Sequence, residues 1–204
     1  MHISWLGNTA IKIQTKPKDD DVSIVIDPYK PSDGNFPKNL APDIAVYTNG
    51  EENSITVGDA FKLTSPGEIE IKNVLISAVQ GNSEEQTMVR IDTEGMSLCH
   101  LGKVKKQLND TQLDILSGVD ILLIPIGGGD EMYNAQEAIK VINDIEPKII
   151  IPIGQKSEND PNADDVEKFI KELGLTPKTT DKKVIIKQKD LPQEETEVYV
   201  LIKE

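Results

Sequence analysis

The sequence predicts an α/β protein in which strands and helices build one sandwich-like domain over residues 1–204. Short alternating or apolar segments, of the kind that form strands, dominate the first half of the chain. In the second half, strand and helix patterns alternate. No repeat, low-complexity tract or linker divides the chain, and 204 residues are enough to bury a core. These observations together indicate a single α/β domain.

The first half predicts a series of short strands separated by turns and one long loop. Gly7-Asn8 and the polar residues 81–85 are turn signals, and residues 30–42 contain three prolines and a glycine, which indicates a loop. Asp27 precedes a proline, so we expect it to end its strand by accepting backbone N–H bonds. The strands are expected at residues 3–5, 10–14, 22–27, 44–47, 60–63, 69–71, 74–78, 88–91 and 95–100.

The second half predicts three helices between buried strands. Asn109 and Asn134 are each followed three residues later by Gln or Glu, the spacing of a capping box at a helix start. Asn162 is expected to cap a third helix that ends before Gly174. The apolar runs at residues 119–124 and 149–153 read as strands buried on both faces, and residues 184–187 and 197–202 as a closing hairpin.

Composition excludes several function classes. A net charge of −13 repels phosphate backbones, so no nucleic-acid partner is expected, and the short basic run at residues 103–106 reads as a solvated face. No apolar run reaches the length of a membrane helix, so no membrane partner is expected. Cys99 is the only cysteine and is expected to pack inside a strand rather than act as a reactive thiol. A cytoplasmic location is the expectation.

Six phrases occur in order along residues 3–155. They are Ile3-Ser-Trp-Leu-Gly7, Ile24-Val-Ile-Asp-Pro28, Pro66-Gly-Glu-Ile-Glu70, His100-Leu-Gly102, Val119-Asp-Ile-Leu-Leu-Ile-Pro-Ile-Gly-Gly128 and Glu146-Pro-Lys-Ile-Ile-Ile-Pro152. Together these phrases resemble the metallo-β-lactamase superfamily, specifically its compact branch of Zn-dependent hydrolases similar to L-ascorbate-6-phosphate lactonases. The resemblance implies an αβ/βα sandwich of two mixed β-sheets with outer helices.

The metal ligands that the resemblance implies are missing from this sequence. After the fourth strand, the family carries a His-x-His-x-Asp-His motif, whose four positions are Asn49, Glu51, Asn53 and Ser54 here. The metal-bridging aspartate corresponds to Lys103, and the final histidine corresponds to Gly154. The resemblance places His100 and Asp27 in the shell behind the metals. No metal cofactor is therefore expected.

The chemistry of a two-metal hydrolase needs several imidazoles and carboxylates, and this chain has only two histidines, His2 and His100. An ammonium at Lys103 would repel a cation where a carboxylate held two. We therefore hypothesise that Lys103 and Glu51 form an ion pair in place of the metals, the alternative being that both side chains face solvent.

Nearby groups offer no other catalytic apparatus. Asp130, which follows three glycines, is expected to order a loop or cap a turn. Gly127-Gly-Gly129 lacks the Lys-Ser/Thr of a phosphate-binding P-loop. No histidine base is identifiable for Ser54 or Ser97.

The favoured function is a catalytically degenerate family member that serves as a binding or scaffolding module. Its partner would be a small molecule, another protein or a second copy of the chain. The alternative is a metal-dependent hydrolase that holds a single hard cation, such as Mg²⁺, Mn²⁺ or Ca²⁺, through Glu51, Asn49, Asn53 and nearby Asp or Glu side chains.

Overall fold

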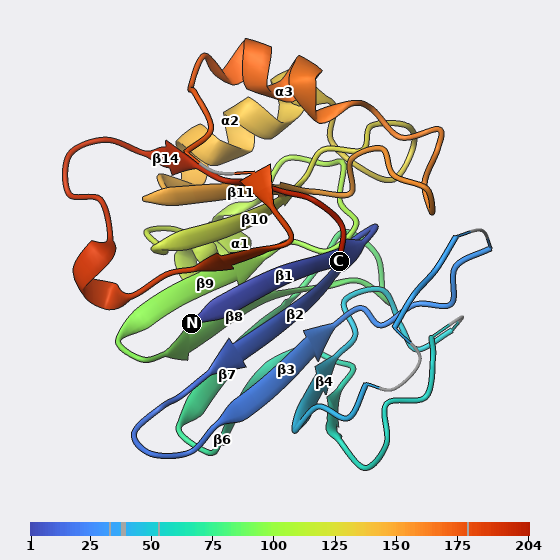
Figure 1. The fold of residues 1–204 in the computed structure, drawn as a ribbon, viewed down its shortest axis with the longest axis vertical. Helices are drawn as coiled ribbons and strands as arrows, with labels where there is room; N and C mark the ends of the chain where they lie inside the picture. Colours follow the sequence, from blue (N-terminus) through green and yellow to red (C-terminus); the bar gives the residue numbers. More distant parts are fainter. Residues whose placement is uncertain (33, 38–39, 53, 179) are drawn as a thin grey trace.

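Two mixed β-sheets stacked face to face form the centre of the protein (Figure 1). The structure is a computed structural model and describes residues 1–204 except positions 33, 38, 39, 53 and 179. The sheet and helix arrangement confirms the predicted α/β sandwich. None of the helices in the described ranges has the length and apolar character that crossing a bilayer requires.

The first sheet has six strands among the described residues and is built mainly from the N-terminal part of the chain. The hairpin β1–β2–β3 is antiparallel, whereas β3, β4 and β5 run parallel to one another. In spatial order its strands are β13 (Lys183–Ile185), β1 (His2–Gly7), β2 (Ala10–Thr15), β3 (Val22–Ile26), β4 (Ile44–Val46) and β5 (Phe61–Leu63).

The second sheet has seven strands among the described residues. The meander β6–β9 is antiparallel, and β9, β10, β11 and β14 are parallel. The spatial order is β14 (Glu197–Val198), β11 (Ile149–Ile153), β10 (Ile121–Pro125), β9 (Met96–His100), β8 (Thr87–Thr93), β7 (Val74–Gln80) and β6 (Gly67–Ile71). A small parallel pair, β12 (Thr180–Asp181) and β15 (Val200–Leu201), forms a two-stranded sheet of its own next to β11.

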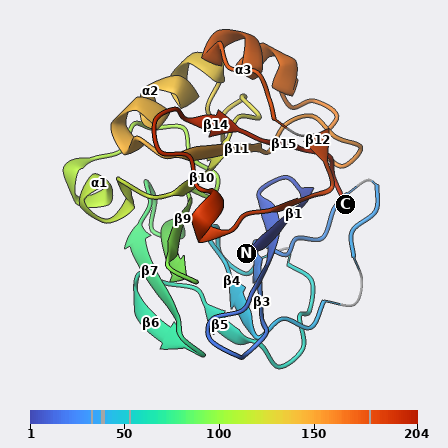
Figure 2. The ribbon, with the colours of Figure 1, turned by 60° about the vertical axis from the view of Figure 1, so that its left-hand side comes forward.

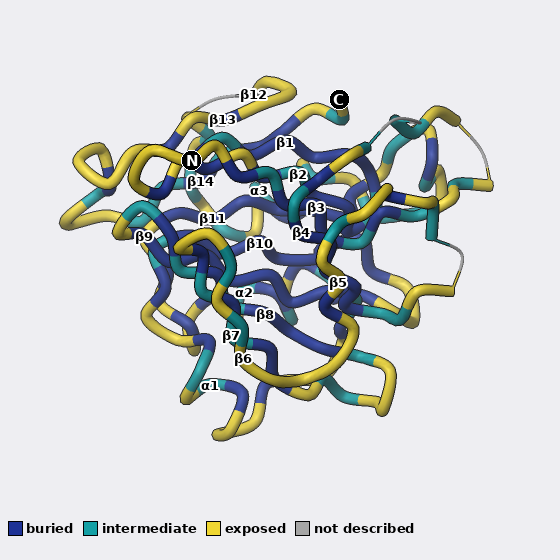
Figure 3. Tube along the Cα trace, turned by 90° about the horizontal axis from the view of Figure 1, so that it is seen from below, coloured by how far each residue is buried: buried dark blue, intermediate teal, exposed yellow. Residues whose placement is uncertain are grey.

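The main apolar core lies between the two sheets. Ile3, Ile24 and Val46 from the first sheet and Ile91 and Leu123 from the second belong to one buried cluster. The burial colouring in Figure 3 shows most strands dark, except the edge strands β5 and β6, and the connecting loops mostly exposed. Alternating and continuous apolar runs in the sequence therefore produce the strands because each has at least one face to bury.

The three α-helices among the described residues pack on the outer face of the second sheet (Figure 2), and a short 3-10 helix spans Gln188–Asp190. The α-helices are α1 (Asp110–Leu116), α2 (Ala135–Ile145) and α3 (Val166–Leu173). Leu116, Val141 and Phe169, one from each helix, belong to a second buried cluster with the outward side chains of the sheet. The capping boxes of α1 and α2 form as predicted, since each cap side chain accepts the backbone N–H three residues on.

Two predictions about the C-terminal part are wrong. Residues 184–187 and 197–202 do not form a hairpin, because β13 pairs with β1 and β14 pairs with β11. The third helix is capped by Asp165 rather than Asn162. A helix starting at residue 162 would need the Asp164 carbonyl as an intrahelical acceptor, but that carbonyl accepts the Lys156 N–H at 3.0 Å, so the helix begins later.

Candidate functional site

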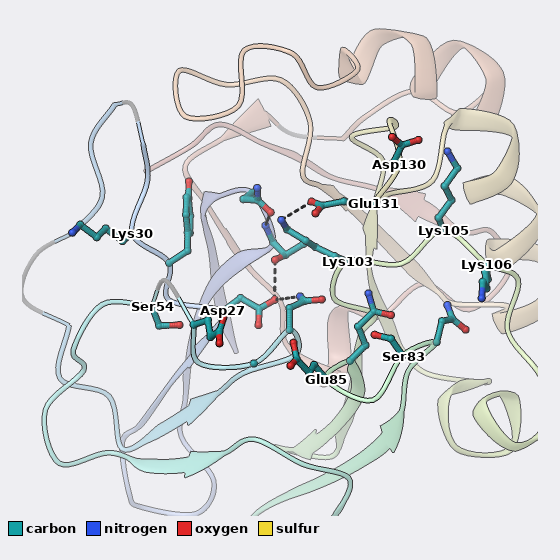
Figure 4. A pocket seen from close by; sticks show the side chains of 18 residues that line it. Asp27, Lys30, Ser54, Ser83, Glu85, Lys103, Lys105, Lys106, Asp130 and Glu131 are labelled. Carbon is teal, nitrogen blue, oxygen red and sulfur yellow. Dashed lines mark hydrogen bonds and ion pairs between the residues drawn. The ribbon is translucent and has the colours of Figure 1, made fainter.

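An open cleft of about 600 Å³ lies where parallel strands of the two sheets end. Asp27 follows β3, Asn49 follows β4 and Lys103 follows β9, and all three line the cleft. The carboxyl ends of parallel strands are a common place for ligand sites in α/β proteins. The cleft is lined by Asn8, Thr9, Asp27, Tyr29, Lys30, Asn49, Gly50, Glu52, Ser54, Asn82, Ser83, Glu85, Gln86, Lys103, Lys105, Lys106, Asp130 and Glu131 (Figure 4).

The Asp27 carboxylate at the floor of the cleft is occupied by donors from the protein itself. It accepts the backbone N–H and the hydroxyl of Thr48, both at 2.6 Å, and the hydroxyl of Thr9 at 2.8 Å. The prediction that Asp27 ends its strand by accepting nearby bonds is confirmed. This carboxylate joins β2, β3 and β4 at their ends.

His100 is fully buried behind the cleft, at the end of β9. Its Nε2 lies 2.8 Å from the Thr9 carbonyl oxygen, and its Nδ1 accepts the Gly102 N–H at 3.0 Å. This pattern requires the proton on Nε2 and a neutral ring. Burial lowers the pKa of His100, against the opposing effect of Asp27. Both nitrogens are bonded to backbone groups, so His100 acts as a structural brace.

Gly102 allows Lys103 to enter the cleft. Its φ is +69°, and a Cβ there would lie 2.5 Å from the Thr48 hydroxyl. A larger residue would therefore be strained and would push the segment after β9 away from β4. The glycine brings the two sheets together at the point where their site residues emerge.

The hypothesised ion pair between Lys103 and Glu51 is wrong. The Lys103 Nζ lies 2.7 Å from a carboxylate oxygen of Glu131, and Glu51 pairs with Lys62 at 2.9 Å. The reason is the direction of the loop after β4. It sends Glu51 toward the neighbouring strand β5, which carries Lys62, while Gly50 and Glu52 line the cleft.

The other residues at the family's motif positions do not all lie in the cleft. Asn49 and Ser54 line the cleft, and the Asn49 amide donates to the Thr48 hydroxyl at 2.9 Å. Asn53 lies outside the described residues. Gly154 lines a neighbouring hollow of about 370 Å³ that shares Asn8, Asp130 and Glu131 with the cleft.

Gly154 has no room for the side chain that the family carries. Its φ is +72°, and a Cβ would lie 2.5 Å from the sulfur of Met132. Met132 is buried, so it has little freedom to move aside. The thioether thus fills the space where a histidine at this position would begin.

The residues present do not fit a two-metal centre. In the part of the chain that the structure describes, no group of three or more His, Cys, Asp or Glu side chains is placed to hold a metal ion. The Asp27 carboxylate already accepts hydrogen bonds from the protein, and the His100 ring is bonded to backbone groups. Lys103 adds a positive charge, paired with Glu131, where a metal would lie. No metal-dependent step can be derived from this geometry.

Several cleft residues could not be found from the sequence. Tyr29, Asn82, Gln86 and Glu131 reach the cleft from loops whose contacts are long-range. The turn at residues 81–86 is brought in by a bridge between Asn49 and Gln86 and by the bond from the Thr87 N–H to the Thr48 carbonyl at 2.8 Å. The only signal in the sequence was the polarity of that turn.

The chain belongs to the beta-lactamase superfamily domain family, whose model matches residues 2–154. The matched part includes both sheets up to β11 and all the motif positions discussed above. The narrower resemblance to ascorbate-phosphate lactonases stays a prediction.

Solved structures share the fold at low sequence identity. A protein of the metallo-β-lactamase superfamily from Thermotoga maritima, assigned as a Zn-dependent hydrolase, is 24% identical over 98% of both chains with a TM-score of 0.80. Igni18, a metallo hydrolase from Ignicoccus hospitalis, is 17% identical over 85% of this chain and 90% of its own, with a TM-score of 0.64. An isothiocyanate hydrolase from Delia radicum gut bacteria is 10% identical over 100% and 97%, with a TM-score of 0.65.

Proposed function

We propose that this protein is a catalytically degenerate member of its family that binds a small molecule in the cleft without metal ions. The observation that carries the proposal is the Lys103 ammonium, which lines the cleft at the position that the resemblance gives to a metal-bridging aspartate. A fixed positive charge there opposes the binding of cations.

The size of the cleft favours a binding module over a purely structural scaffold. Although Met132 occupies the space beside Gly154, about 600 Å³ of the cleft remain open to solvent. This volume is in the range of small-molecule sites. A scaffold that had lost all use for its cleft would have no reason to keep it open.

The alternative hydrolase with one hard cation has less support. It would draw oxygen ligands from Glu51 and Asn49, yet the Glu51 carboxylate is engaged with Lys62 outside the cleft. The fold neighbours named as hydrolases share only the architecture, and an architecture alone does not define a reaction.

Elemental analysis of the purified protein tests the proposal. The protein is grown with added Zn²⁺ and Mn²⁺, and its thermal melt is recorded with each metal and after treatment with a chelator, alongside a known zinc enzyme. We expect far less than one metal per chain and no shift of Tm. One or two bound metals with a clear rise in Tm would overturn the proposal.

A further inference from the structure

Lys103 lines the cleft and is paired with Glu131, a carboxylate that it can exchange for a ligand's. The side chain of Lys103 is 29% exposed, whereas that of Glu131 is 67% exposed on the rim. Figure 4 shows the two side chains meeting in the open part of the cleft. Exposed ion pairs of this kind contribute little free energy because water and salt screen them.

We propose that the cleft binds a small molecule carrying one oxyanion, a carboxylate or a phosphate, and that Lys103 receives it in exchange for Glu131. The inference rests on the proposed function and names its ligand class. In this arrangement the ammonium supplies the positive charge that metals supply in related sites. A bound oxyanion would form a charge-assisted hydrogen bond with Lys103, which is stronger than a neutral one.

Two buried donors support a ligand rich in acceptor oxygens. The hydroxyl of Tyr29 and the side-chain N–H group of Asn82 both belong to residues lining the cleft. Among the described residues, each of these buried atoms lacks a hydrogen-bond partner. Burial, with Asp160 and Glu158 nearby, raises the pKa of Tyr29, so its hydroxyl keeps its proton and remains a donor. Unpaired buried donors are uncommon, and a small shift of either side chain toward the cleft would let a ligand oxygen satisfy it.

The rim limits how much negative charge the ligand can carry. Lys105 and Lys106 follow Lys103 on one wall, which favours the approach of an anion. Glu52, Glu85 and Asp130 also line the cleft and repel a polyanion. Mixed charges of this kind select a small molecule with a single anionic group rather than a nucleic acid.

An NMR titration of the ¹⁵N-labelled full chain tests the inference. The probes are inorganic phosphate and acetate, each added at constant ionic strength against chloride, so that the two arms separate a phosphate site from a carboxylate site. We expect saturable shifts of the Gly102 and Lys103 amides with at least one probe. The Lys103→Gln variant should weaken binding about tenfold or more, because it loses the charged donor, and Lys103→Arg should retain most of it.

The Glu131→Gln variant gives the sharpest result, since it removes the competing carboxylate and should tighten binding about threefold. Glu51→Gln is its matched control, because that carboxylate pairs with Lys62 outside the cleft, and it should leave the affinity unchanged. The spectra themselves report whether each variant is folded.

The inference is overturned if neither probe gives saturable shifts, if Lys103→Gln binds as well as wild type, or if Glu131→Gln does not tighten binding. None of these results alters the metal content measured by elemental analysis. The proposed function and the ligand class can therefore fail separately.

Discussion

Asp27 and Thr48 stand at the ends of neighbouring parallel strands and are joined by two hydrogen bonds of 2.6 Å, one to the Thr48 N–H and one to its hydroxyl. The same carboxylate accepts the Thr9 hydroxyl, and Thr9 in turn accepts from His100. This chain of bonds connects the first sheet to the end of β9 in the second. It shapes the floor of the cleft without any metal ion.

Loss of the Asp27 carboxylate should destabilise the protein. In Asp27→Ala, the Thr48 N–H and two hydroxyls lose their acceptor, so we expect the free energy of unfolding to fall by about 3 kcal/mol. Urea denaturation measures the change. Asp130→Ala, on the exposed rim of the same cleft, is the control and should change stability by less than about 0.5 kcal/mol. Equal effects of the two substitutions would contradict the bracing role of Asp27.

His100 should make the stability dependent on pH. Burial lowers the pKa of His100 in the folded protein below its ordinary value of 6.5, so the unfolded chain binds the proton first as the pH falls. The part of the folding free energy that depends on neutral His100 is fully present above pH 6.5. It is lost as the pH falls from there toward the folded-state pKa.

The pH effect of His100 is measured by urea denaturation at about pH 7.5 and about pH 5.5. Wild type should lose more stability between these values than His100→Gln, whose amide can keep both backbone bonds. A His100→Gln variant with the same pH dependence as wild type would show that another group is responsible.

A side chain at Gly154 should be tolerated poorly. Gly154→Ala combines a strained φ with a collision against the Met132 sulfur. Gly174 provides a matched control, because its φ is +73° and a Cβ there would meet no atom within 4 Å. Backbone strain alone costs about 1–2 kcal/mol, so denaturation should show that loss for Gly174→Ala and a clearly larger one for Gly154→Ala. Similar losses would mean that Met132 moves aside.

The two kinds of helix start should respond differently to loss of the cap side chain. Asn134 accepts the Glu137 N–H at 3.0 Å, so Asn134→Ala should cost about 1 kcal/mol. Asp165 caps α3 without a side-chain hydrogen bond, so Asp165→Ala should cost much less. Thermal and urea unfolding of both variants compare them directly. A larger loss for Asp165→Ala would contradict the cap geometry.

The sequence predicted those parts of the fold that local signals determine. Strand patterns located β1 to β11 because each apolar run needs a buried face. The capping boxes at Asn109 and Asn134 located two helix starts because a cap acts within four residues. The resemblance placed Asn49, Ser54, Lys103 and Asp27 at one site, and all of them line the cleft.

Long-range pairing was not readable from the sequence. The partner of Lys103 is Glu131, and the partners of β13 and β14 are β1 and β11, all distant along the chain. Such choices depend on how loops run after the sheets are assembled. A single sequence contains no local signal for them, which is why the ion pair and the C-terminal hairpin were predicted wrongly.

The late closure of both sheets has a consequence for biosynthesis. Ile3 pairs with Val184, and Ile150 pairs with Val198, so the open sides of β1 and β11 acquire neighbours only when the last part of the chain is available. A nascent chain that has emerged only as far as β11 therefore exposes two unpaired strand edges, which are templates for aggregation. During translation, these two edges should need protection by a chaperone until residues 183–198 have left the ribosome.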